Sequence, residues 1–144
     1  MAYLETFLHG VTNRLSAAGV KALPEYALKL RPVPADTLFV TAAVGELRHE
    51  PPMPFAGGTA VPVSLTLRLR FHCRPEDGAE KLSICWELTV LPLLLGMGLA
   101  TASAVLGPPV YDRTLDRLVR EAQVQIAAAV TQRPLPGSGT EVTA

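Results

Sequence analysis

Residues 63–75, VSLTLRLRFHCRP, alternate between apolar and polar side chains with a strict period of two. The apolar members occupy the odd positions, namely Val63, Leu65, Leu67, Leu69, Phe71 and Cys73. The polar members occupy the even positions, namely Ser64, Thr66, Arg68, Arg70, His72 and Arg74. Because successive side chains of a strand point to opposite faces, this pattern predicts a long strand with one face on a hydrophobic core and the other face in water.

Three arginines, Arg68, Arg70 and Arg74, lie on the predicted wet face and form the candidate functional surface of the chain. One hypothesis is a strip that contacts phosphates along a nucleic acid. A second is a solvent-facing sheet surface on which the arginines pair across strands with acids such as Glu121. A third is contact with acids of an adjacent copy of the same protein, as in a ring. The alternation places these side chains outside the core and leaves all three hypotheses open.

Composition favours one folded domain and weakens the nucleic-acid hypothesis. Of the 144 residues, 49% are hydrophobic and 18% are charged, which is typical of a folded domain and excludes disorder for most of the chain. We predict a single domain over residues 1–133 and a flexible C-terminal tail over residues 134–144. Thirteen basic and thirteen acidic side chains give a formal charge of zero, whereas nucleic-acid binders normally carry a clear basic excess.

Helices and a further strand are expected around the long strand. Apolar residues at helical spacing over residues 4–18 predict an amphipathic helix that covers the sheet. Asp77 and Glu80 approximate a capping box, after which a period of 3.6 predicts a second helix that ends or kinks before Pro92. Residues 37–47 are apolar on both faces and predict an interior strand. The fold class is therefore α+β, and the expected core contains Val40, Val44, Leu65, Leu67, Leu69, Phe71, Leu82, Trp86, Val124 and Ile126.

Residues 115–130 admit two interpretations. Their composition and an apolar face that begins at Leu115 favour a helix. From Ala122 to Val130, however, apolar side chains also fall on every second position, as in a strand. Intrinsic propensity by itself favours the helix.

Residues 88–111 contain no charged side chain over a length that could span a membrane. Prolines and glycines divide this stretch into pieces of strand or short-helix length, so we expect a buried helix end, a glycine loop and a buried strand instead. The start of the chain carries Glu5 and lacks the basic and apolar blocks of a secretory leader. Residues 48–60, rich in proline and glycine, are expected to form an exposed, mobile loop.

The sequence lacks a recognisable catalytic or cofactor motif. His72 and Cys73 are neighbours on a strand and point to opposite faces, so they cannot share a metal ion or a proton. Glu46, His49 and Glu50 have side chains that could bind a metal ion, and a solvated strand end is the preferred interpretation. The two cysteines cannot form a secreted disulfide scaffold, and a reduced cytosolic compartment is expected. We predict no enzyme activity, no cofactor and no metal.

The order of the expected elements resembles that of the small tail-terminator or tail-completion proteins of long-tailed bacteriophages and of prophages in Gram-positive bacteria. Three stretches carry the local likeness. They are YLETFLHGVTNRLSAAGV for the first helix, VPVSLTLRLRFHCRPEDGAEKL for the long strand running into a helix, and LGPPVYDRTLDRLVREAQVQI for a strand, a turn and a strand. Because the last stretch resembles strands in that family, we predict a strand for residues 115–130.

The resemblance implies a structural role. It implies a mixed, mainly antiparallel β-sheet, with an N-terminal helix and a central helix packed on one face. It also implies a homo-oligomeric ring, commonly a hexamer, that docks to tail-tube and neck proteins, without a cofactor, a membrane or a specific nucleic-acid sequence. Such a protein would occupy the bacterial cytoplasm during assembly and then the virion tail. In a ring, Arg68, Arg70 and Arg74 would face a neighbouring subunit or the channel.

A second hypothesis comes from a different class of function. A small-molecule or lipid-binding module, or a membrane-associated protein, would use the uncharged residues 88–111 to line its binding surface.

Overall fold

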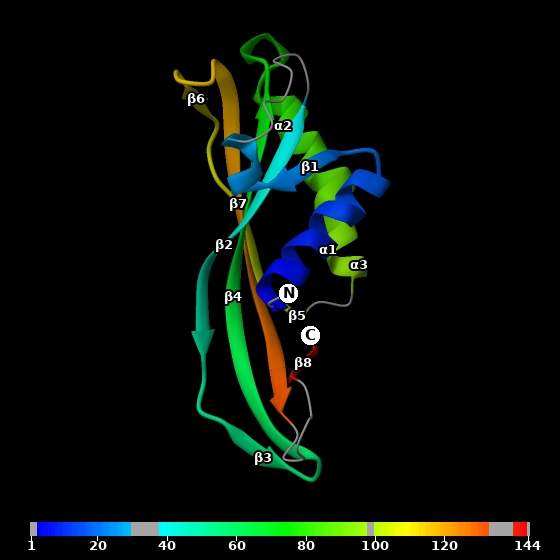
Figure 1. Ribbon diagram of the computed structural model, residues 1–144. Helices are drawn as coiled ribbons and strands as arrows, with labels where there is room; N and C mark the ends of the chain where they lie inside the picture. Colours follow the sequence, from blue (N-terminus) through cyan, green and yellow to red (C-terminus); the bar gives the residue numbers. More distant parts are fainter. Residues whose placement is uncertain (1–2, 30–37, 98–99, 133–139, 144) are drawn as a thin grey trace.

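The structure, a computed structural model, describes residues 3–29, 38–97, 100–132 and 140–143. Within these residues eight strands form one mixed sheet, and the longer helices pack against one of its faces (Figure 1). The predicted α+β class, with a mainly antiparallel sheet and helices on one face, is confirmed.

Two long antiparallel strands form the centre of the sheet. β4 (Gly58–Cys73) and β7 (Arg117–Gln132) pair along almost their whole length, and Leu67 lies opposite Val124. Register follows from the alternation in residues 63–74, because a slip of one position would move every arginine into the core.

The remaining strands extend the sheet on both sides of this pair. On the β4 side lie β1 (Lys21–Pro24), β2 (Phe39–His49) and β3 (Met53–Phe55). On the β7 side lie β5 (Ala100–Leu106), β6 (Val110–Asp112) and β8 (Thr140–Thr143). The main path is β1-β2-β4-β7-β5, with β3 paired to β4, and with β6 and β8 paired to β7. β1 runs parallel to β2, and the other pairs are antiparallel.

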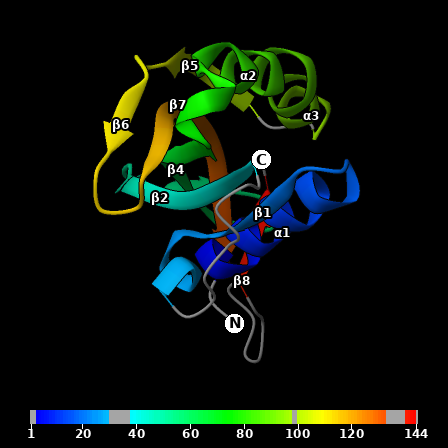
Figure 2. The ribbon, with the colours of Figure 1, turned by 90° about the horizontal axis from the view of Figure 1, so that it is seen from above.

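The helical layer consists of an N-terminal helix and a segmented central helix. These are α1 (Tyr3–Ala17), α2 (Ala79–Cys85), the π-helical turn η3 (Trp86–Val90) and α3 (Leu91–Gly96). Figure 2 shows α1 and α3 on the same side of the strands. Two short 3₁₀ turns, η1 (Glu25–Lys29) and η2 (Pro75–Asp77), connect the elements. The opposite face of the central strands therefore has no α-helix over it among the described residues.

The core lies between the sheet and the helical layer. Nine of the ten predicted core residues are buried, namely Val40, Leu65, Leu67, Leu69, Phe71, Leu82, Trp86, Val124 and Ile126. The tenth, Val44, is half-buried and packs against this cluster. The rings of Phe71 and Trp86 meet edge to face with their centroids 5.9 Å apart, which joins β4 to the central helix. Val11 and Leu15 of α1 are fully buried, so the first helix covers the sheet as predicted.

The central helix continues beyond Pro92, so the expected end of the helix at this residue is wrong. Proline has no N–H, and its ring clashes with the carbonyl four residues earlier in a regular helix. Here the preceding turn is π-helical, and the chain passes through this irregular turn into α3, which has Pro92 as its second residue. The predicted capping box is absent. Asp77 lies in η2, the N-cap of α2 is Gly78, and the Asp77 carboxylate instead pairs with Arg74 and Lys81.

Residues 117–132 form strand β7, so the predicted strand is confirmed from Arg117 onward, whereas Leu115 and Asp116 lie in the preceding turn. Ala122, Val124 and Ile126 are buried, whereas Gln123 and Gln125 are exposed. Burial of alternate side chains and pairing with β4 outweigh the helical propensity of this sequence.

Other segments differ from their predicted structure. Residues 48–60, expected as a mobile loop, contain β3, which pairs with the first residues of β4. The strand after the central helix, expected to be buried, is the edge strand β5, and most of its described side chains are exposed. The expected flexible tail, residues 134–144, includes β8, while residues 134–139 and 144 lie outside the described residues. Among the described helices, none is long and apolar enough to cross a membrane.

Candidate functional site

The face of the sheet opposite the helices carries the polar side chains of the central strands. We call these residues the polar strip; they are Ser64, Thr66, Arg68 and Arg70 on β4, and Glu121, Gln123 and Gln125 on β7. The Gln125 amide donates to the Thr66 hydroxyl at 2.8 Å. Because register places the two sets directly beside each other, the strip is held together by hydrogen bonds between strands.

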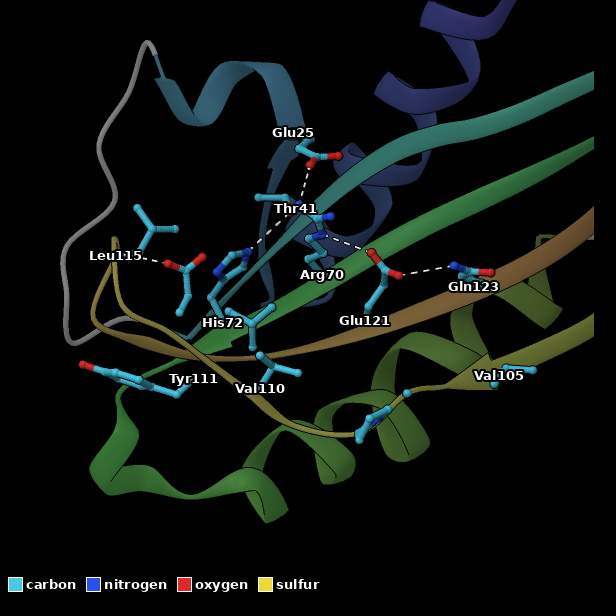
Figure 3. Close-up of a pocket in the computed structure, with 14 residues that line it drawn as sticks. Glu25, Thr41, Arg70, His72, Val105, Val110, Tyr111, Leu115, Glu121 and Gln123 are labelled. Atoms are coloured by element: carbon cyan, nitrogen blue, oxygen red, sulfur yellow. Dashed lines mark hydrogen bonds and ion pairs between the residues drawn. The ribbon is translucent and has the colours of Figure 1, made fainter.

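Arg68 and Arg70 take part in one ion-pair cluster, at the end of the polar strip nearest the C-terminus of β4. Glu25 accepts from both arginines, at 2.6 Å from Arg68 Nη2 and 2.8 Å from Arg70 Nη1. Glu121 lies on the other side, 3.1 Å from Arg70 Nε and 3.7 Å from Arg68 Nε (Figure 3 shows Glu25, Arg70 and Glu121). The two positive charges of the arginines are therefore neutralised by two carboxylates of the same chain.

The cluster shifts the pKa of Arg68. The hydrogen bond that Arg68 donates to Glu25 raises the pKa of Arg68 above its ordinary value. Burial partly opposes this shift, and the charges of Glu25 and Glu121 reinforce it. All four side chains are between 27% and 41% exposed, so water still screens their attraction. The cluster links η1 to β4 and β7 across the open face, and partial exposure keeps its contribution to stability small.

One of the two acids was predicted from the sequence. Glu121 was expected to pair with the arginines across strands, and it is the Cα partner of Arg70. Glu25 was missed because it comes from η1, 43 and 45 positions before the arginines, and no local pattern indicates that this turn folds over β4. Arg74 does not join the cluster. It lies beyond the end of β4 and pairs with Asp77 at 3.2 Å.

His72 is buried, although the alternation predicted it on the wet face. Its ring stacks on Phe39 at a centroid distance of 4.4 Å, and its Nε2 lies 3.4 Å from the Thr41 hydroxyl. Burial, reinforced by the charges of Arg117 and Arg70, lowers the pKa of His72 to about 4. The imidazole is therefore neutral near pH 7, and its Nδ1 has no hydrogen-bond partner among the described residues.

A pocket of about 760 Å³ opens beside His72, between η1 and the β6 region (Figure 3). Its polar lining contains Glu25, Thr41, Arg70, His72 and Glu121, and its apolar lining contains Val105, Val110, Tyr111 and Leu115. These apolar side chains are between 40% and 61% exposed. The pocket therefore combines a charged floor with an apolar wall that faces water.

The turn between β6 and β7 shapes the apolar wall. The Asp112 carboxylate accepts from the backbone N–H of Leu115, and the Tyr111 hydroxyl donates to Asp116. This hydrogen bond to Asp116 is the main reason that the pKa of Tyr111 is raised. Asp116 itself adopts a positive φ of 51°, a conformation that Asp tolerates in tight turns.

Among the described residues no three His, Cys, Asp or Glu side chains lie close enough together to hold a metal ion, and this includes Glu46, His49 and Glu50. Cys73 is buried and Cys85 half-buried, both as free thiols, and burial raises the pKa of each. A thiol with a raised pKa is a poor nucleophile at neutral pH. The described open face offers hydrogen bonds, compensated charges and exposed apolar side chains.

Comparisons with protein-family models, with curated proteins and with solved structures found no match for this chain.

Proposed function

We propose that this protein is a structural component of a phage or prophage tail, of the tail-terminator or tail-completion type. It acts by assembling into a ring and by docking to tail-tube and neck proteins. The proposal rests on the sequence resemblance described above. It is supported by an element order of helix, strands, long strand, helix and strands in one mixed sheet, the order that the resemblance implies.

The observation that carries the proposal is an apolar surface left exposed on the central helix. Ile84, Leu88 and Leu95 follow helical spacing on its outer side, and they are 49%, 73% and 56% exposed. Met53 and Phe55 at the tip of β3 are also about half exposed. Large apolar side chains gathered on one surface element are typical of surfaces that contact another protein. Together with a net charge of zero, they favour assembly over an isolated monomer.

Co-sedimentation with purified phage tail tubes tests the docking part of this proposal. The wild-type chain should pellet with the tubes, and the Leu88→Ser variant should pellet several-fold less. Glu87→Gln, a change at the neighbouring exposed position, is the matched control and should bind as the wild type does. Equal binding by the wild type and Leu88→Ser would show that the exposed surface of the central helix does not contact the tail tube. Absence of wild-type binding would remove the docking function.

The pocket beside His72 favours a second candidate function, a small-molecule or lipid-binding module. Its volume of about 760 Å³ falls in the range of ligand pockets, and residues 105–111 supply part of its wall. A thermal-shift screen with amphipathic ligands, repeated on Val110→Asp, tests this function. A ligand that stabilises the wild type and not the variant would favour the binding module over the tail protein.

A further inference from the structure

The sheet has two open edges, and the register of the strands between them places these edges opposite each other. On one side, β1 pairs with β2 over residues 39–42, and from Ala43 to Arg48 the outer side of β2 has no strand partner among the described residues. On the other side, β5 pairs with β7 and, within the described chain, has no partner on its outer side. Unpaired backbone groups along an edge are a template for a further strand.

The register places residues of the two open edges in the same cross-strand row. Val44 is the Cα partner of Leu67, Leu67 of Val124, and Val124 of Ala104. A single row of residues thus crosses four strands, from the open edge of β2 to the open edge of β5.

Strand direction also fits. β2, β4, β7 and β5 alternate in direction, because each pair in this series is antiparallel. A second copy in the same orientation would therefore place its β2 antiparallel to β5 of the first. No copy has to be inverted, so the contact is head to tail and can be repeated around a ring.

The two edges differ in how they are protected. β2 carries a bulge between Val44 and Glu46, whereas β5 has neither a charged side chain nor a proline. Charges, prolines and bulges are the usual means of keeping edge strands apart, and β5 has only a register shift near its start, between Thr101 and Ser103. β5 is therefore the more exposed template of the two.

We infer that β5 of one copy pairs with the open edge of β2 in the next copy, which continues the sheet from subunit to subunit. This inference rests on the proposed ring function and identifies the surface and the partner through which the ring forms. The partner is a second copy of this chain.

The register identifies the backbone groups that would make this contact. Gly107 N–H donates to the Glu121 carbonyl at 2.7 Å, so in an antiparallel ladder Val105 and Ser103 also direct their backbone groups toward β7. The N–H and C=O groups of Ala104 and Leu106 then point outward. Proline at position 104 would remove an outward donor and leave the ladder with β7 intact.

The test compares Ala104→Pro with Ala104→Ser, which keeps the N–H and is the matched control. Both variants and the full-length wild type are examined by light scattering and negative-stain microscopy. Circular dichroism verifies that each is folded. We expect closed rings for the wild type and for Ala104→Ser, and folded monomers for Ala104→Pro. A small fraction of Ala104→Pro mixed into wild type should yield open, shorter assemblies, because it still offers its β2 edge.

Amide hydrogen exchange on the wild type provides a measurement that needs no variant. The amides of Ala104 and Leu106 should exchange at least about tenfold more slowly in the ring than in the monomer, as a new hydrogen bond requires. Rings that form equally well with Ala104→Pro, or equal exchange in ring and monomer, would overturn the edge pairing and leave the ring function standing. A mixture that leaves wild-type rings unchanged would overturn the head-to-tail contact. A wild-type chain that never associates would overturn the ring function itself.

Discussion

Arg70 on β4 and Glu121 on β7 are Cα partners across the centre of the sheet, and Arg70 Nε lies 3.1 Å from Glu121 Oε1. Arg68 shares the same two acids, Glu121 and Glu25. Two neighbouring cations on the open face are thus neutralised inside one chain. A neighbouring subunit would not need to supply acids to this surface, and reversing the charge of both arginines would break an internal cluster as well as any contact between subunits.

Replacing Glu25 with Gln should destabilise the protein by about 1 kcal/mol, because Arg68 and Arg70 would be left beside each other with one acid between them. The effect is small because the four side chains are partly exposed and water screens their attraction. Urea denaturation at low salt measures the change, and added salt should reduce it. Glu46→Gln is the control: its pair with Arg48 is 67% exposed on both sides and should contribute little. Equal effects of the two substitutions would contradict the role of Glu25.

Stability should fall with acidification between about pH 6.5 and pH 4 because of His72. Its pKa in the folded protein is about 4, so within this window the unfolded chain binds a proton that the folded chain does not. Stability from this group is complete above pH 6.5 and decreases as the pH falls, by an amount on the order of 3 kcal/mol at pH 4.

The His72→Gln variant should show a flatter dependence of unfolding free energy on pH in that window. His9→Gln, a change at an exposed histidine, is the control and should keep the wild-type profile. Urea titrations at several pH values decide between them. An unchanged slope in His72→Gln would show that this ring is not the group responsible.

Leu67→Ala should destabilise the protein by about 3 kcal/mol, because Leu67 is fully buried where β4 meets β7 and the helical layer. Leu88→Ala removes the same atoms from a side chain that is 73% exposed and should change stability by less than about 0.5 kcal/mol. Thermal unfolding monitored by circular dichroism compares the two. A small loss for Leu67→Ala would place the core elsewhere.

Much of the fold could be predicted because its signals are local. The alternation in residues 63–74 determines which face of β4 is buried, and helical spacing in residues 4–18 indicates the face of α1 that packs. β7 is the instructive exception. Its local propensity favours a helix, and it is a strand because Val124 and Ile126 are buried against β4, a contact that lies far away in sequence.

The site could be predicted less well, because long-range folding builds it. Alternation placed His72 on the open face, yet Phe39 and Thr41 from β2 cover it. Glu25 reaches the arginines through a turn whose position depends on β1 pairing with β2. The exposed position of β5 was also missed, since its apolar composition resembles that of a buried strand, and only its place at the end of the sheet exposes it.

The molar mass of the full chain in solution, measured by light scattering over a wide concentration range, tests the central claim most directly. A ring-forming tail protein should rise from the 15.4 kDa monomer to a fixed multiple of that mass and then stay there, because a closed ring adds no further copies. A mass that remains at 15.4 kDa up to the highest concentration, together with no binding to purified tail tubes, would contradict the proposed function.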